Sequence, residues 1–135
     1  MKELVLYYSF SGNSKQVAEE FSQAKNLPIC EIRTQRRLGK LAAYSVGIVK
    51  AIQGSGMPIA QPAISLSACE TAHIFAPVWA GVPAPPINSA IALLPKGCTL
   101  HLYMVSASGK SSEERVTMQL QGKGYAVAGY EDIRK

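Results

Sequence analysis

Residues 9–14, with the sequence SFSGNS, place three serines, a glycine and an asparagine between an apolar segment and an amphipathic one. A phosphate group needs several hydrogen-bond donors that converge without bulky side chains. Exposed backbone N–H groups at the start of a helix supply such donors, and serine hydroxyls add more. The same residue types also form ordinary turns that cap a helix. The segment therefore indicates either a phosphate-binding loop or a serine-rich turn.

Two further segments contain residue types that suit a bound ring. Residues 77–86, PVWAGVPAPP, surround the only tryptophan of the chain, Trp79, with small residues. A rigid apolar loop with a projecting aromatic side chain suits stacking on a flat ring, and the alternative is a tryptophan folded into the core. Residues 106–111, SASGKS, are small, polar and rich in backbone donors. This segment is either a third ligand-binding loop or an ordinary turn.

The cysteines and histidines do not indicate a metal site or a disulfide framework. The three cysteines, Cys30, Cys69 and Cys98, are odd in number and contain no CxxC spacing. The two histidines, His73 and His101, do not belong to a ligand motif. All five lie in or beside apolar segments, so we expect them to be buried structural residues.

The formal charge of +5 makes nucleic acid the first partner to consider. The basic residues are scattered except for a cluster at Arg33, Arg36, Arg37 and Lys40. This cluster has no interleaved aromatic residues and no nucleic-acid-binding motif around it. We therefore expect a solvated loop and no nucleic-acid partner, and the alternative is docking of an acidic partner or a phosphate group.

The hydrophobic pattern predicts a protein that is neither exported nor embedded in a membrane. No apolar run approaches the roughly 18 residues of a membrane-spanning helix. The apolar stretch near the N-terminus is too short for a signal peptide, and a polar loop follows it. We expect a cytoplasmic protein without a membrane partner.

The length of 135 residues predicts a single domain over residues 1–135. Short apolar segments alternate with segments of helical periodicity. We predict strands at residues 4–8, 29–33, 71–76, 99–105 and 125–129, and helices at residues 15–25, 38–53, 87–94 and 112–120. Strands that are apolar on both faces belong to a parallel sheet covered by helices. Strict alternation predicts an α/β, doubly wound five-stranded parallel sheet.

Ligands bind such sheets beyond the carboxyl ends of the strands. The segments SFSGNS, PVWAGVPAPP and SASGKS follow the first, third and fourth predicted strands. They are therefore expected to meet at one edge of the sheet.

These segments resemble the flavodoxin-like family of small FMN-binding proteins. SFSGNS after LVLYY resembles the flavodoxin phosphate loop, and PVWAGVPAPP after the third strand resembles the loop beside the flavin ring. The resemblance covers nearly the whole chain. It implies the strand order 2-1-3-4-5 and noncovalent binding of FMN. The positions that match cofactor-binding positions of the family are Ser9, Ser11, Gly12, Asn13 and Ser14, then Pro77, Val78, Trp79, Ala80 and Gly81, and, by place only, Ser106, Ala107, Ser108 and Gly109.

The resemblance implies redox work, either as an electron carrier for a partner protein or as a reductase of a small, quinone-type acceptor. In both roles the protein holds the flavin, tunes its potential and exposes its edge. No catalytic acid or base is evident in the sequence. The alternative is a binding or structural module that has the fold but no longer binds flavin.

The sequence departs from the flavodoxin pattern at three points. The third loop has no aromatic residue, the chain is basic rather than acidic, and residues 130–135 are too few for the family's fifth helix. Without most of that helix, one face of the third to fifth strands would be uncovered. We expect a second copy to cover this face in a homodimer. The alternative is that residues 53–69 fold over it.

Overall fold

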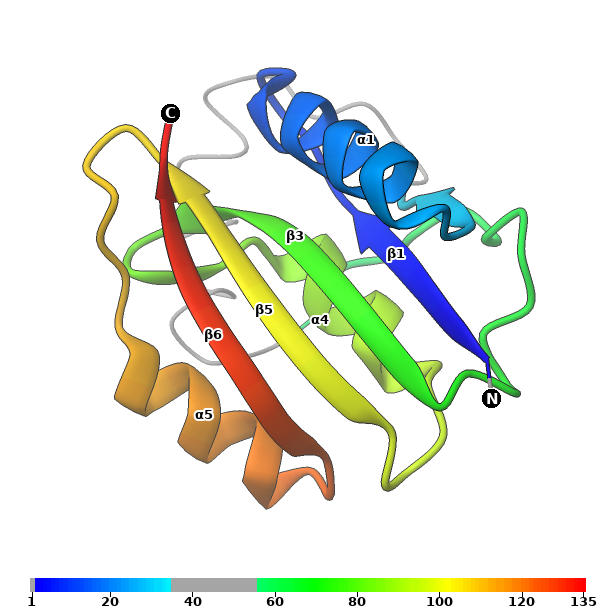
Figure 1. The fold of residues 1–135 in the computed structure, drawn as a ribbon. Helices are drawn as coiled ribbons and strands as arrows, with labels where there is room; N and C mark the ends of the chain where they lie inside the picture. The colour runs from blue at the N-terminus through cyan, green and yellow to red at the C-terminus, as the bar shows by residue number, and fades with distance from the viewer. Residues whose placement is uncertain (1, 35–55) are drawn as a thin grey trace.

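A twisted parallel sheet with helices on both faces forms the molecule (Figure 1). The computed structural model describes residues 2–34 and 56–135. Its elements are β1 (Glu3–Tyr7), α1 (Asn13–Lys25), β2 (Ile29–Glu31), β3 (Thr71–Trp79), β4 (Val82–Pro83), α4 (Pro85–Ala92), β5 (Thr99–Ser106), α5 (Glu113–Gly122) and β6 (Ala126–Arg134). The predicted helix at 38–53 and the basic residues Arg36, Arg37 and Lys40 lie outside the described residues.

The strand order is β2-β1-β3-β5-β6, and all neighbours on this path are parallel. The short strand β4 pairs antiparallel with β3 and lies off this path. Counted along the five parallel strands, the order is the predicted 2-1-3-4-5, which defines the flavodoxin-like fold. The prediction of the fold class is therefore confirmed.

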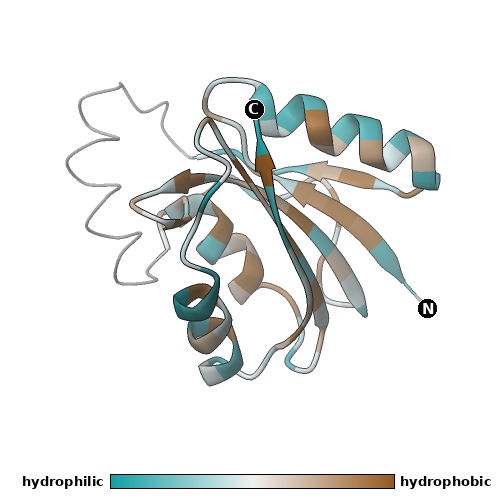
Figure 2. Ribbon diagram, turned by 60° about the vertical axis from the view of Figure 1, so that its left-hand side comes forward, coloured by the Kyte–Doolittle hydropathy of each residue, from teal (hydrophilic) through white to brown (hydrophobic). Residues whose placement is uncertain are grey.

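The two faces of the sheet contact different helices. One face carries the even-numbered residues of β1, β3 and β5, such as Leu6, Ile74 and Leu102, and packs with α4 and α5 in the larger core cluster. The other face carries Val5, Tyr7 and Phe75 and packs under α1. Figure 2 shows α1 on one side of the sheet and the other two helices on the opposite side. The period-two alternation of side chains along each strand produces this division.

Two strands are longer than the sequence predicts. β3 continues through Pro77 to Trp79, although proline is uncommon inside a sheet. The carbonyl of Pro77 accepts a hydrogen bond from the backbone N–H of Ala84 at 3.1 Å, so its backbone polar groups face the hairpin with β4. Its missing N–H therefore removes no hydrogen bond to β5.

β6 continues to Arg134, although the prediction ended this strand at Gly129. A Cβ atom at Gly129 would lie 2.7 Å from Nδ1 of His101, beside a local irregularity in the pairing of β5 with β6. Glycine is therefore required inside the strand by close packing and does not mark its end.

The face under α1 is less apolar than expected. Phe21 of α1 contacts Tyr103 of β5 at a ring-centroid distance of 5.3 Å, so α1 reaches the middle of the sheet. Beyond it, Tyr103 and Ile133 are half-buried and Glu131 is exposed. The large exposed hydrophobic residues of the described chain are Phe10, Leu93 and Met118, and none of them lies on this face.

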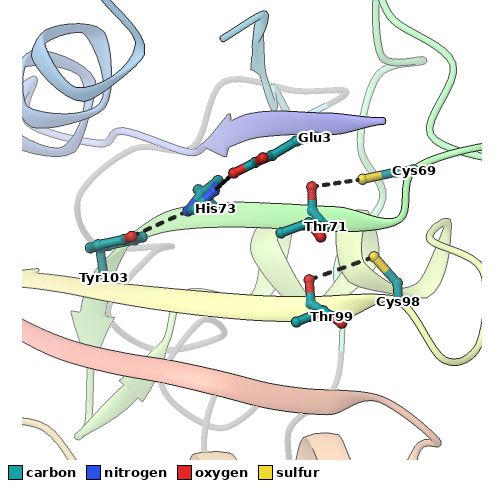
Figure 3. Close-up of polar contacts among 7 residues, drawn as sticks. All are labelled: Glu3, Cys69, Thr71, His73, Cys98, Thr99 and Tyr103. Carbon is teal, nitrogen blue, oxygen red and sulfur yellow. Dashed lines mark hydrogen bonds and ion pairs between the residues drawn. The ribbon is translucent and has the colours of Figure 1, made fainter. Parts of the chain in front are cut away.

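A cluster of polar and aromatic side chains lies under α1 at the amino ends of the strands (Figure 3). Nε2 of the buried His73 pairs with Glu3, and its Nδ1 lies 3.2 Å from the hydroxyl of Tyr103. The ring of His101 stacks on His73 with centroids 4.8 Å apart. The three cysteines are buried free thiols, as predicted. Among residues 2–34 and 56–135, no helix is long and apolar enough to cross a membrane.

The histidine stack predicts that stability falls in mild acid. Burial, then the neighbouring His73, lower the pKa of His101, and Glu3 opposes this shift. The unfolded chain therefore takes up a proton at His101 before the folded protein does. The contribution of His101 to stability is complete above its unfolded pKa of about 6.5 and is lost as the pH falls through the lower folded pKa.

Thermal unfolding from pH 7.5 to pH 5.5 measures this loss. We expect the melting temperature to decrease with pH, and the decrease to be smaller in His101→Gln, which cannot take up the proton. Lys25 lines the same cavity as His101, and Glu131 acts electrostatically on the neighbouring Tyr103. Both residues are present in the two proteins. Equal pH dependence of the two proteins would contradict the assignment to His101.

Candidate functional site

Three loops meet at the carboxyl edge of the parallel strands. They are loop 1 (residues 8–12) after β1, the turn of the β3–β4 hairpin, and loop 3 (residues 107–112) after β5. Because the strands are parallel, these loops follow strand ends on the same side of the sheet. The sequence predicted this convergence, and the contacts below describe it.

Loop 1 leads directly into α1. Gly12 has a φ of 100°, a left-handed conformation that favours glycine, and it precedes the first helical residue, Asn13. The hydroxyl of Ser9 accepts a hydrogen bond from the backbone N–H of Gly12 at 2.8 Å. Asn13 and Ser14 thus lie in the first turn of α1, two residues earlier than the predicted start. This turn contains no acidic residue and includes Lys15.

The β3–β4 hairpin turns through Ala80 and Gly81. Val78 pairs with Pro83 and Trp79 pairs with Val82. Ala80 and Gly81 both have positive φ values, 55° and 85°, as a two-residue type I′ turn requires. Pro77, Val78 and Trp79 are therefore strand residues, which corrects the expectation of a loop over residues 77–86. The hairpin gives the tryptophan a rigid support at the sheet edge.

Trp79 lies between two other aromatic residues. Its ring is edge-on to Tyr8 at 6.3 Å and edge-on to Phe10 at 5.8 Å between centroids. Phe10 is 40% exposed, and Trp79 is half-buried. The tryptophan thus packs against the core while part of its ring stays accessible, and its contact with Phe10 joins the hairpin to loop 1.

Loop 3 is held by its own serines. The hydroxyl of Ser106 accepts a hydrogen bond from the N–H of Gly109 at 3.0 Å, and that of Ser108 accepts one from the N–H of Lys110 at 3.2 Å. The backbone N–H of Ser112 donates to the carbonyl of Gly81 at 2.6 Å. This last bond joins loop 3 to the hairpin.

The end of β6 forms one side of the site, which the sequence did not predict. The backbone N–H of Lys135 donates to the carbonyl of Ser106 at 2.8 Å, and Nδ2 of Asn13 lies 3.5 Å from the carbonyl of Lys135. A Cβ atom at Gly109 would lie 3.0 Å from Cβ of Arg134. Figures 1 and 2 both show the C-terminus beside the start of α1. The structure thus brings all three predicted segments together and adds the end of β6.

Two further functional candidates come from β6. The hydroxyl of Ser111 donates to Oδ1 of Asp132 at 2.5 Å and is also hydrogen-bonded to the hydroxyl of Tyr130. Burial is the main cause that raises the pKa of Tyr130, and the hydrogen bond to Ser111 opposes it. Asp132 places a carboxylate beside loop 3. Sequence reasoning missed it because β6 was expected to end at Gly129.

The site does not hold the side chains of a metal centre. Within residues 2–34 and 56–135, no group of three or more histidine, cysteine or acidic side chains is arranged to hold a metal ion. The site instead offers backbone donors, serine hydroxyls and aromatic rings.

The comparisons with known proteins agree with the fold. No protein-family model and no curated protein matches the chain. Among solved structures, a flavoprotein from Lactobacillus acidophilus NCFM in complex with FMN is 23% identical, has a TM-score of 0.74, and aligns over 96% of this chain and 91% of its own. The apo-form of the flavoprotein from the same organism is 26% identical, has a TM-score of 0.66, and aligns over 97% and 92%.

A third similar structure comes from Bacteroides eggerthii DSM 20697. This protein is 20% identical, has a TM-score of 0.77, and aligns over 96% of this chain and 86% of its own. The chain thus has the flavodoxin-like α/β fold over the described residues 2–34 and 56–135.

The hairpin turn yields a prediction about stability. A side chain at Gly81 would be strained by the positive φ, and its Cβ would lie 2.8 Å from Oγ of Ser112. Gly81→Ala should therefore lower the free energy of unfolding by about 1–3 kcal/mol. Ala80→Asn should raise it by up to about 1 kcal/mol, because asparagine tolerates the left-handed conformation better than alanine.

Urea unfolding of both variants measures these changes. The two substitutions affect adjacent residues of one turn, so each serves as the control for the other. A loss of stability in Ala80→Asn equal to that in Gly81→Ala would contradict the type I′ assignment.

Proposed function

We propose that this protein, as a single domain, binds FMN noncovalently at the edge formed by loop 1, the β3–β4 hairpin and loop 3. The observation that carries the proposal is the first turn of α1, which SFSGNS leads into. This turn contains no acidic residue and lies at the same edge of the sheet as Trp79. The same fold occurs in a flavoprotein whose structure contains FMN.

The donors of loop 1 fit a phosphate group. The first N–H groups of a helix have no partner within the helix, and the positive end of the helix dipole favours an anion. A Cβ atom at Gly12 would meet no atom within 4 Å apart from those of its chain neighbours, so the space on that side of Gly12 is open. Ser11 and Asn13 are exposed and can add hydroxyl and amide donors. We therefore assign the FMN phosphate to Ser9, Ser11, Gly12, Asn13 and Ser14.

The hairpin and loop 3 fit the flavin ring. Trp79 offers a half-exposed aromatic surface that is fixed by Tyr8 and Phe10. The backbone N–H and C=O groups of residues 77–81 and 106–109 can form hydrogen bonds with the polar edge of the ring. We therefore assign the ring to Pro77, Val78, Trp79, Ala80 and Gly81 on one side and to Ser106, Ala107, Ser108 and Gly109 on the other.

Bound FMN supplies one- or two-electron transfer, and the chain supplies binding, orientation and electrostatics. Loop 3 and the hairpin contain no acidic residue, but Asp132 bonds Ser111 at their border. A carboxylate there disfavours negative charge nearby, whereas Lys110 and Arg134 favour it. We infer a redox role, as an electron carrier or as a reductase of a small, quinone-type acceptor, in a cytoplasmic protein.

Binding of FMN and riboflavin to the cofactor-free protein tests the proposal. Quenching of flavin fluorescence should show much tighter binding of FMN, because only FMN has the phosphate. Equal affinities would contradict the phosphate assignment. Absence of binding to both flavins would favour the alternative, a module with the fold but without flavin. If FMN binds, an assay of NAD(P)H oxidation with FMN and a quinone present distinguishes a reductase, which oxidises NAD(P)H, from a carrier, which does not.

Asn13→Asp should weaken FMN binding selectively. The new carboxylate would stand against the phosphate and replace a donor, which costs about 2 kcal/mol or more, or about 30-fold in affinity. Riboflavin affinity should change little. Gln23→Glu, in the last turn of the same helix, adds the same charge away from the site and is the matched control. An equal effect of both substitutions would show that only net charge matters.

We also propose a homodimer. The second copy would cover the part of the α1 side of the sheet that β5 and β6 form and that α1 itself does not reach. The half-buried Tyr103 and Ile133 would lie in the interface. Light scattering at micromolar concentration should give twice the chain mass of 14.5 kDa. A single species at the chain mass would reject the dimer.

A further inference from the structure

Two of the three cysteines lie side by side at the amino ends of β3 and β5, at the opposite end of the strands from the proposed flavin site (Figure 3). Cys69 stands two residues before the first residue of β3, and Cys98 stands one residue before the first residue of β5. The backbone N–H of Thr99 donates to the carbonyl of Glu70 at 2.9 Å, and Thr71 pairs with Thr99. The two cysteines thus lie on hydrogen-bonded neighbouring segments, one residue out of register, with Cys98 opposite Glu70.

Both thiols lie inside the same core cluster. Cys69 is 2% exposed and Cys98 is 3% exposed. The thiol of Cys69 donates to the carbonyl of Thr71 at 3.2 Å, and the thiol of Cys98 donates to the carbonyl of Thr99 at 3.8 Å. Strands lie about 4.8 Å apart and rise about 3.3 Å per residue, so Cα atoms that are one residue out of register are about 5.8 Å apart. This distance is within the range of about 4.4–6.8 Å that a disulfide spans. The backbone therefore does not need to move far to join the two sulfur atoms.

We propose that Cys69 and Cys98 form an oxidisable dithiol pair, which a hydroperoxide converts to a disulfide that links the start of β3 to the start of β5. The thiolate of Cys98 attacks one peroxide oxygen, so that the O–O bond breaks and a sulfenic acid and hydroxide form. The sulfur of Cys69 then attacks the sulfenic sulfur, forms the S–S bond and releases water. In sum, two thiols lose two electrons and two protons, and hydrogen peroxide becomes two waters.

The surroundings of the pair determine its reactivity. Burial is the main cause that raises the pKa of Cys69 to about 12, and burial also raises the pKa of Cys98. The neighbouring Cys69 lowers the pKa of Cys98 and so opposes this shift, whereas Cys98 raises the pKa of Cys69 further; Cys98 therefore ionises first and is the attacking thiol. Since the thiolate is the nucleophile, oxidation should be slow at neutral pH and should accelerate close to tenfold per pH unit. The pair is distinct from Cys30, which lies in β2 with its thiol toward the carbonyl of Glu31.

Peptide mapping of the folded protein after treatment with hydrogen peroxide tests this pairing. Cleavage after lysine and arginine puts each cysteine in its own peptide, because Cys30 falls in residues 26–33, Cys69 in residues 51–96 and Cys98 in residues 97–110. Remaining thiols are alkylated before digestion without reductant. We expect a linked species of the last two peptides, two hydrogen atoms lighter than their sum, and an alkylated Cys30. Its rate of formation should be about 100-fold higher at pH 9 than at pH 7.

Three controls determine whether the folded geometry causes the pairing. The same treatment in guanidinium chloride should lose the selectivity and link Cys30 as well. Cys30→Ala should retain the linked species, and Cys98→Ala should lose it. The wild-type map stands even if a variant fails to fold. A folded protein that gives links to Cys30, links only between chains, or sulfinic acids without a link would overturn the proposal, as would equal selectivity in guanidinium chloride.

Discussion

The parallel pairing of β3 between β1 and β5 is the constraint on which the rest of the molecule depends. Because all three strands run in the same direction, their carboxyl ends reach one edge and their amino ends reach the other. Because successive side chains alternate, Ile74 and Leu102 face α4 and α5, whereas Phe75 faces α1. Both faces of the central strand are buried, so a shift of register by one residue would exchange the two faces. The pairing therefore positions the loops as well as the core.

Contacts between the loops then hold the carboxyl edge. Phe10 on Trp79 joins loop 1 to the hairpin, and the hydrogen bond from Ser112 to Gly81 joins the hairpin to loop 3. The end of β6 joins loop 3 to the start of α1, because Lys135 is hydrogen-bonded to both Ser106 and Asn13. Each of these contacts connects segments that are far apart in sequence. The proposed flavin site is consequently a property of the assembled sheet and not of any one loop.

The resemblance to flavodoxin-like proteins implied the strand order, whereas the parallel sheet and the three converging segments could be predicted from the sequence itself because those signals are local or follow from general rules. Alternating apolar segments predict parallel strands, and SFSGNS before a helix predicts donors for an anion. The hairpin at Ala80 and the extension of β6 could not be predicted in this way. Proline at residue 77 and glycine at residue 129 usually interrupt strands, and here the hairpin partner and His101 explain them. Asp132 was missed for the same reason, since its approach to Ser111 depends on that extension.

Amide NMR of the isotopically labelled protein during titration with FMN tests the central claim most directly. The account predicts that the resonances that change most belong to residues 9–15, to the indole N–H of Trp79 and to residues 106–109. Riboflavin should reproduce the changes at Trp79 and residues 106–109 but not those at the start of α1. Changes centred on the amino ends of the strands, around His73 and His101, or no changes at saturating FMN, would contradict the account.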